Sequence, residues 1–131
     1  MSRLAWGLAA ALILVSPAAA ADVFGAWKNP KGSVHLDIRP CNAEVCGFVI
    51  YASANADADA RKTTGKPLVG QQLLRDFRPD RNGWRGKVYV PDMDRTFAGS
   101  ARLLDDDRLE AKGCVLGGLI CKTQVWRRVR N

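Results

Sequence analysis

Apolar and polar residues alternate along most of the chain from residue 23 onward, with the two-residue period of a strand that buries one face. Val34, Leu36 and Ile38, for example, fall on one face of their segment, whereas His35 and its polar neighbours fall on the other. Alternation, or an enrichment in β-branched and aromatic residues, marks eight segments at 23–28, 33–39, 46–52, 71–77, 84–90, 96–104, 108–115 and 119–129. The pattern predicts an all-β protein.

Clusters of glycine, proline, asparagine and aspartate separate these segments at 29–32, 78–83, 91–94 and 105–107. Short connections of this kind join neighbouring antiparallel strands. Eight short strands within residues 22–131 therefore favour a small antiparallel up-and-down β-barrel, because closing the sheet removes its exposed edges. A sandwich of two sheets is the alternative architecture.

Residues 52–67, with the sequence ASANADADARKTTGKP, lack both strand alternation and an apolar helical period. The segment is too long for a hairpin turn, and loops of this length in compact domains are either functional or mobile. Asp57 and Asp59 resemble part of a calcium site, but the further oxygen ligands and the glycine of an EF-hand are missing. We predict a solvated loop that acts as a flap near one mouth of the barrel.

The start of the chain has the pattern of a secretory signal peptide. Arg3 precedes an apolar run at 4–15, which is too short to span a bilayer comfortably, and a run of small residues follows. We expect cleavage near Ala20 or Ala21. The product would be a single domain at 22–131, located in the periplasm or secreted, with no segment that spans a membrane.

All four cysteines lie in this predicted exported domain, where an even number favours disulfides. A two-residue turn at Gly117-Gly118 would put Cys114 opposite Cys121 on adjacent strands. The same counting puts Cys41 opposite Cys46 across a four-residue loop, and facing residues on antiparallel strands are close enough for a sulfur bridge. We therefore predict the disulfides Cys41–Cys46 and Cys114–Cys121, each of which staples one hairpin.

Metal binding and catalysis fit the sequence less well. A zinc site favours C-x-x-C spacing or nearby histidines, and the chain has one histidine, His35, with no evident partner in its strand. The two cysteine spacings also differ from that of a redox dithiol. The carboxylates at 105–107 lie in a predicted turn, where solvation explains them. We expect no metal, no cofactor and no enzymatic activity.

The cysteine register predicts which side chains of the second hairpin face the barrel interior. It sets Leu36 opposite Tyr51, so that Val49 and Tyr51 point inward and Phe48 and Ile50 point outward. The long polar loop at 52–67 is the expected cover for the two outward residues.

The later hairpins predict an interior with both large and small side chains. Trp84 and Phe97 point inward together with glycines and alanines, which either let the sheet bend or leave room for a guest. In the last strand Lys122 and Gln124 share the inward face with Trp126, and buried polar groups need partners or water. A bulge that turns Lys122 outward, with Gln124 bonded to backbone, is the alternative. The candidate ligand-binding residues are Tyr51, Trp84, Phe97, Lys122, Gln124 and Trp126.

The two ends of the domain carry a further signal. Trp27 lies in the first predicted strand and Arg128 in the last, and these strands are neighbours in a closed meander. We expect the guanidinium of Arg128 to stack on the Trp27 ring as a structural pair. The G-x-W motif with a late arginine resembles the lipocalin and wider calycin arrangement, and those families bind small, often apolar ligands inside the barrel.

A further set of motifs covers nearly all of the predicted domain. These motifs are Phe24-Gly-Ala-Trp27, Cys41 to Cys46-Gly47, Gly65-Lys-Pro-Leu68 with Gly70, Asn82-Gly-Trp84 with Gly86-Lys-Val-Tyr89, Pro91-Asp92, and Lys112-Gly113 before Thr123-Gln-Val-Trp126. In this combination the chain resembles the exported bacterial family called domain of unknown function 2147, which implies a lipocalin-like barrel in the periplasm and no settled activity. It departs from the family at Asp94, where a glycine is common, and in the Asp-x-x-Asn stretch of the long loop.

The chain has a formal net charge of +7, which becomes +6 without Arg3. Export removes nucleic acid as a partner and leaves an anionic envelope surface or an acidic protein, although a scattered basic surface also aids solubility. Two functions follow. The protein either binds a small apolar or amphipathic molecule inside the barrel, or it is an envelope interaction module with a solid core. Internal space near Gln124 distinguishes between them.

Overall fold

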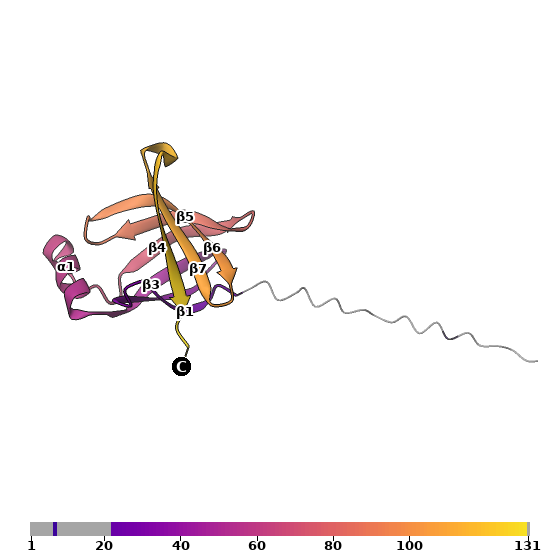
Figure 1. Ribbon diagram of the computed structural model, residues 1–131, viewed down its shortest axis with the longest axis horizontal. Helices are drawn as coiled ribbons and strands as arrows, with labels where there is room; N and C mark the ends of the chain where they lie inside the picture. Colours follow the sequence, from indigo (N-terminus) through magenta and orange to yellow (C-terminus); the bar gives the residue numbers. More distant parts are fainter. Residues whose placement is uncertain (1–6, 8–21, 131) are drawn as a thin grey trace, which may run out of the picture.

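The computed structural model describes residue 7 and residues 22–130, so the predicted cleavage site at Ala20 or Ala21 lies outside the described residues. Eight antiparallel strands close into one barrel in which each strand pairs with the next and β8 pairs with β1 (Figure 1). The elements are β1 (Gly25–Lys28), β2 (Val34–Cys41), β3 (Glu44–Ala52), α1 (Ala54–Thr64), β4 (Gln72–Asp80), β5 (Gly83–Val90), β6 (Arg95–Asp105), β7 (Arg108–Val115), the 3-10 turn η1 (Leu116–Gly118) and β8 (Ile120–Arg128).

The strand order gives the barrel two different ends, because successive connections alternate between them. The connections after β1, β3, β5 and β7 lie at one end, which we call the open end; it carries α1 and η1. The hydroxyl of Thr63 in α1 donates to the backbone carbonyl of Asp92 in the β5–β6 turn at 3.0 Å. The other connections and both ends of the domain lie at the opposite end, which we call the closed end. Among the described residues, no helix is long and apolar enough to cross a membrane.

The closed end is sealed by the predicted pair of Trp27 and Arg128. Trp27 is fully buried, and its indole nitrogen donates to the Val23 carbonyl at 2.9 Å. The Arg128 guanidinium lies 4.3 Å from the centre of the Trp27 ring. It also donates to the backbone carbonyls of Phe24 at 2.8 Å and Asp106 at 2.7 Å. One side chain of β8 therefore ties the first strand, the segment before it and the β6–β7 turn together.

Both predicted disulfides are present. Cys114 and Cys121 face each other across β7 and β8 as expected, with their Cα atoms 4.1 Å apart. Cys41 and Cys46 are 5.8 Å apart, but they are diagonal neighbours rather than facing residues. The β2–β3 turn has only two residues, and Asn42 adopts the left-handed conformation that a tight turn needs, with φ 57°.

A bulge in β3 changes the predicted facing of Tyr51. The register of β2 and β3 shifts between His35 and Leu36, so Ile50 is an extra residue that turns the following residue to the other side of the sheet. Val49 is buried as predicted, whereas Tyr51 is 46% exposed and packs against the His35 ring with the centroids 4.6 Å apart. The inward prediction for Tyr51 is wrong. Phe48 is covered by Arg39 rather than by the segment at 52–67.

The segment at 52–67 is a helix over most of its length, which corrects the loop prediction. Ser53 caps the start of α1 by accepting from the Ala56 N–H at 3.2 Å, and Gly65 ends it in the left-handed conformation, with φ 70°. Ala60 packs into the core with no exposed surface. The carboxylate of Asp57 accepts from the Leu68 N–H at 2.9 Å and from Arg61 at 2.6 Å. Local capping and alanine content form this helix without an apolar stripe.

Gly86 and Gly99, two of the interior glycines, serve close packing of the sheet rather than leaving room for a guest. A Cβ at Gly86 would lie 2.7 Å from the backbone oxygen of Arg75 on β4, and a Cβ at Gly99 would overlap the side chain of Val88. These positions let the β4–β6 wall bend inward.

Candidate functional site

The barrel encloses a cavity of about 460 Å³ that opens at the open end. Every strand except β3 contributes side chains to its walls, and most of these side chains are apolar. The deeper walls include Trp27, Ile38 and Phe77, which are fully buried. The interior of this small barrel is therefore hollow, contrary to the alternative of a solid core, and its volume lies in the range of small-molecule sites.

Four of the six predicted ligand-binding residues line this cavity. Phe97 comes from β6, and Lys122, Gln124 and Trp126 come from alternate positions of β8. The β7–β8 pairing runs from Arg108↔Arg127 to Val115↔Ile120 without a register shift, so the alternative in which a bulge turns Lys122 outward is not realised.

Gln124 and Trp126 form a polar contact within the apolar wall. The Trp126 indole nitrogen donates to the side-chain oxygen of Gln124 at 3.2 Å. This bond leaves the Gln124 amide group as a donor, and no hydrogen bond between the described residues uses it. Gln124 therefore does not bond backbone at the end of the barrel, and its NH2 group offers two N–H donors beside the cavity.

The mouth of the cavity combines apolar and basic side chains. Met93 from the β5–β6 turn and Ile120 from β8 are 53% and 59% exposed, and both line the opening. Lys112 and Lys122 are exposed at the same opening, and neither takes part in an ion pair between described residues. Positive charge thus lies at the entrance, above an apolar interior.

Tyr89 also lines the cavity, but its polar atom is already engaged. The Tyr89 hydroxyl donates to the carboxylate of Asp94 at 2.7 Å, and this bond raises the pKa of the Tyr89 phenol. Arg75 lies 4.4 Å from the centre of the Tyr89 ring on its outer side. The residue supports the β5–β6 turn at the mouth, and it stays protonated at neutral pH.

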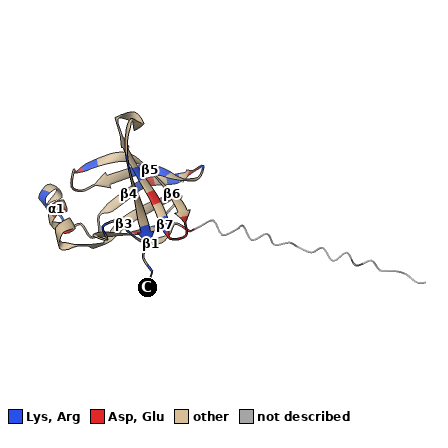
Figure 2. Ribbon diagram, viewed as in Figure 1, with Lys and Arg blue, Asp and Glu red and all other residues tan. Residues whose placement is uncertain are grey.

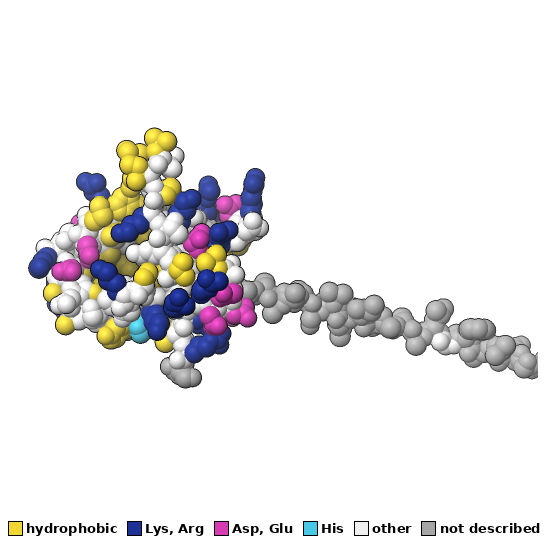
Figure 3. Space-filling model, viewed as in Figure 1, with side chains coloured by type: hydrophobic (Ala, Val, Ile, Leu, Met, Phe, Trp, Pro, Cys, Tyr) yellow, Lys and Arg dark blue, Asp and Glu magenta, His cyan; other side chains and the backbone are white. Residues whose placement is uncertain are grey.

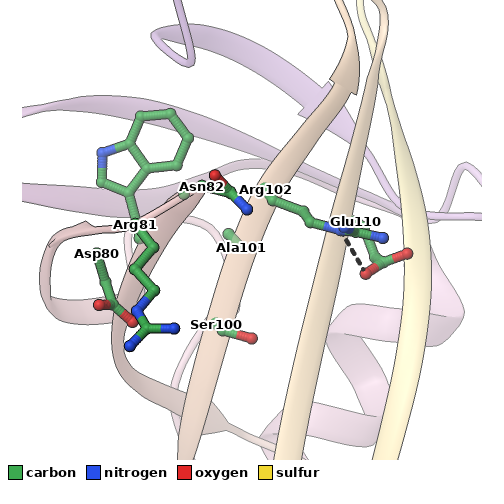
Figure 4. Close-up of a pocket in the computed structure, with 9 residues that line it drawn as sticks. Asp80, Arg81, Asn82, Ser100, Ala101, Arg102 and Glu110 are labelled. Carbon is green, nitrogen blue, oxygen red and sulfur yellow. Dashed lines mark hydrogen bonds and ion pairs between the residues drawn. The ribbon is translucent and has the colours of Figure 1, made fainter.

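Trp84 and Tyr51 lie outside the cavity. Trp84 pairs with Ala101, close to the β4–β5 turn and thus toward the closed end, and it is partly buried against the core. It lines a separate, shallow hollow of about 220 Å³ instead. Figure 4 shows this hollow, where Arg102 and Glu110 form an ion pair at 3.0 Å and Arg81 lies beside Asp80. Its charged side chains are largely solvated and converge on no common point.

Met93, Leu73 and Leu74 are among the cavity residues that sequence reasoning missed. Met93 lies in a turn, where alternation assigns no inside or outside. Leu73 and Leu74 are adjacent yet both line the cavity, because the β3–β4 register shifts beside Leu74. Such irregularities give no signal in the spacing of apolar residues.

Charge and potential ligands for metals are dispersed over the described residues. No group of three or more His, Cys, Asp or Glu side chains that could hold a metal ion occurs among them. Figure 2 shows lysine and arginine positions in several separate elements rather than in one continuous block.

The fold and the sequence were compared with known proteins. A search of curated proteins finds no similar sequence. Among solved structures, the chain is similar to the Helicobacter pylori protein HP1028, which is described as belonging to the lipocalin family. The two share 16% sequence identity with a TM-score of 0.66, and the match covers 84% of each chain. This likeness concerns the fold.

The family comparison covers the barrel itself. The model of a family described as "Uncharacterized protein conserved in bacteria (DUF2147)" matches residues 25–128, which run from the first residue of β1 to the last residue of β8. The chain therefore belongs to the DUF2147 family and has a lipocalin-like barrel.

Proposed function

We propose that this protein binds a small apolar or amphipathic molecule in the barrel cavity. The observation that carries the proposal is the open, largely apolar space of about 460 Å³. Water would fill it with on the order of fifteen molecules, most of them facing side chains that offer no hydrogen bond. Replacing that water with an apolar group is favourable.

The distribution of polar groups favours an amphipathic ligand with an acidic or hydrogen-bond-accepting head. Lys122 and Lys112 supply positive charge at the mouth, and the Gln124 amide supplies a donor further in. An apolar tail would lie against Trp126, Leu109 and Phe77. A neutral apolar molecule fills the same walls but gains nothing from the lysines.

Export and the lack of catalysis remain part of this proposal. The leader-like pattern at the start of the chain supports a periplasmic or secreted location. His35, the single histidine, packs on Tyr51 outside the barrel and therefore offers no base to the cavity wall. The alternative, an envelope interaction module, assumed a barrel whose core is filled with side chains. The cavity beside Gln124 does not fit that assumption.

Native mass spectrometry of the protein, produced from its full sequence in a bacterial host and purified without detergent, tests the proposal. We expect a retained species of defined mass that denaturation releases. The same spectrum gives the N-terminus and thus the cleavage site. A preparation that carries no small molecule, and that also fails to bind an anionic apolar dye such as anilinonaphthalene sulfonate, would contradict ligand binding.

A further inference from the structure

The end of the β7–β8 hairpin exposes a cluster of aliphatic side chains that the barrel does not need. Leu116, Leu119 and Ile120 are 69%, 84% and 59% exposed. We call these three residues the hairpin tip. Figure 1 shows the hairpin projecting beyond the rest of the barrel, and Figure 3 shows its hydrophobic surface in yellow. Large aliphatic side chains at the end of a projecting hairpin are typical of a contact with another phase or partner.

The hairpin tip is held in one conformation. The disulfide Cys114–Cys121 joins the two strands directly beneath it, and the Leu119 N–H donates to the Leu116 carbonyl at 3.3 Å. Leu116 adopts a left-handed backbone conformation, with φ 54°, which a branched side chain rarely does. The apolar side chains are thus presented on a fixed support, so little conformational freedom would be lost on contact.

The charges around the hairpin tip favour an anionic surface. Lys122 and Lys112 lie two to four residues from it along β8 and β7, and Arg95 begins the adjacent strand β6. No ion pair between described residues uses any of the three. Figure 3 shows basic side chains near the yellow projection. The two acidic residues of the nearby β5–β6 turn are Asp92 and Asp94, and Asp94 is engaged by Tyr89.

The shape of the projection favours a bilayer over a protein partner. A stable protein interface buries about 800 Å² on each side, which the end of one two-stranded hairpin does not supply. A narrow apolar projection with basic residues behind it instead matches the interface of an anionic bilayer. There, apolar groups enter the boundary between headgroups and acyl chains, and lysines form ion pairs with lipid phosphates.

We propose that the hairpin tip inserts into the surface of an anionic lipid bilayer. Val115, next to the tip, and Ile120, within it, both line the cavity, so this docking turns the mouth of the cavity toward the membrane. A ligand could then pass between bilayer and cavity without crossing water. That last step rests on the proposed function, whereas docking itself does not.

Flotation with lipid vesicles tests the docking. The protein, produced from its full sequence and checked by intact mass, is mixed with vesicles of phosphatidylcholine alone or with about one-third phosphatidylglycerol. The test variant carries Leu116→Asn and Leu119→Ser, which remove two exposed side chains and retain a residue that tolerates the left-handed conformation. The control variant carries Ile50→Ser and Leu104→Ser, which remove two exposed aliphatic side chains elsewhere.

We expect wild-type protein to bind the anionic vesicles at least about tenfold more strongly than the neutral ones, with the difference reduced by salt. The tip variant should lose about tenfold or more of this binding, while the control variant keeps it. Equal binding by the tip variant, equal loss in the control variant, or no binding of wild-type protein to either vesicle would overturn the proposal. A wild-type dimer that becomes a monomer in the tip variant would also overturn it, because the tip then contacts a second copy.

The dye anilinonaphthalene sulfonate, added to each variant without vesicles, separates this proposal from the proposed function. If the tip variant binds the dye but no longer floats with the vesicles, the cavity still accepts a ligand and the tip is needed for membrane binding. Vesicle binding by a protein that carries no small molecule and takes up no dye contradicts ligand binding and leaves docking in place. If wild-type protein binds the dye but binds neither kind of vesicle, the docking proposal is contradicted and the proposed function is not.

Discussion

At the scale of single residues, this barrel is defined by a few side chains that break an otherwise regular alternation. Lys122 and Gln124 occupy inward positions of β8 where apolar residues would satisfy the pattern. Arg128, at the end of the same strand, donates hydrogen bonds to backbone carbonyls at the closed end. The first two residues bear on ligand choice, and the third bears on stability.

Replacing Lys122 by Gln should weaken the binding of an anionic apolar dye by about twofold to fivefold, because a solvent-exposed ion pair contributes at most about 1 kcal/mol. Binding of a neutral apolar dye should not change. Fluorescence titration measures both, and Lys31→Gln in the β1–β2 turn is the matched control because it removes an equal charge from a residue at the open end that does not line the cavity. An equal loss of affinity for the neutral dye would mean that Lys122 shapes the cavity rather than attracting an anionic ligand.

Replacing Arg128 by Ala should lower the free energy of unfolding by about 2 to 3 kcal/mol, because three backbone carbonyls lose a charged donor and the Trp27 ring loses its cover. Urea unfolding followed by tryptophan fluorescence measures the change. Arg127→Ala, one residue earlier on the exposed side of β8, should change it by less than about 0.5 kcal/mol. Similar losses in both variants would show that the contacts of Arg128 contribute little.

At the scale of elements, helix α1 depends on local capping, and its Asp57 carboxylate binds the backbone of the segment that follows the helix, at Leu68. The Leu68 N–H and then Arg61 hold the pKa of Asp57 below the ordinary value of 3.8. A carboxyl whose pKa is lower in the folded state stabilises the fold above its unfolded pKa. That contribution is lost as the pH falls through the folded pKa.

The difference in unfolding free energy between wild type and Asp57→Asn should therefore be constant near neutral pH and shrink as the pH falls below about 4. Asn retains an oxygen that accepts from Leu68, so the variant removes the charge and keeps the shape. Urea unfolding at a series of pH values measures the difference, with Asp59→Asn as the control on the same helix. A difference that persists unchanged in acid would assign the effect to something other than the carboxylate charge.

The strands of this protein were largely predictable, as were the turns at 91–94 and 105–107, whereas the two-residue β2–β3 turn and the helix within 52–67 were not. Period-two alternation locates β2 and β5–β8 because each buries one face, and it also predicts that Lys122, Gln124 and Trp126 point inward. It fails at Tyr51, where the bulge at Ile50 turns the ring to the outside of the sheet. It fails for α1 because the helix buries Ala60 without a broad apolar stripe. Trp84 was assigned to the correct strand, but alternation does not say how deep a cavity extends.

At the scale of the whole molecule, the two ends of the barrel differ in construction. The closed end is tied by Trp27, Arg128 and the segment that precedes β1. The open end carries the cavity mouth, exposed lysines and the projecting hairpin tip. The residues that stabilise the barrel and the residues proposed to bind a ligand therefore lie at opposite ends. Substitutions at the mouth should change binding with little effect on the closure of the barrel.

The most direct test of the central claim is to fill the cavity and measure binding. Ala111 lines the cavity, whereas Ala98 is exposed on the outside of β6, so Ala111→Phe and Ala98→Phe add the same ring inside and outside. In titrations with anilinonaphthalene sulfonate, folded Ala111→Phe protein should bind at least about tenfold more weakly than wild type, and Ala98→Phe should bind equally well. Unchanged dye binding by a folded Ala111→Phe variant would contradict a ligand site inside the barrel.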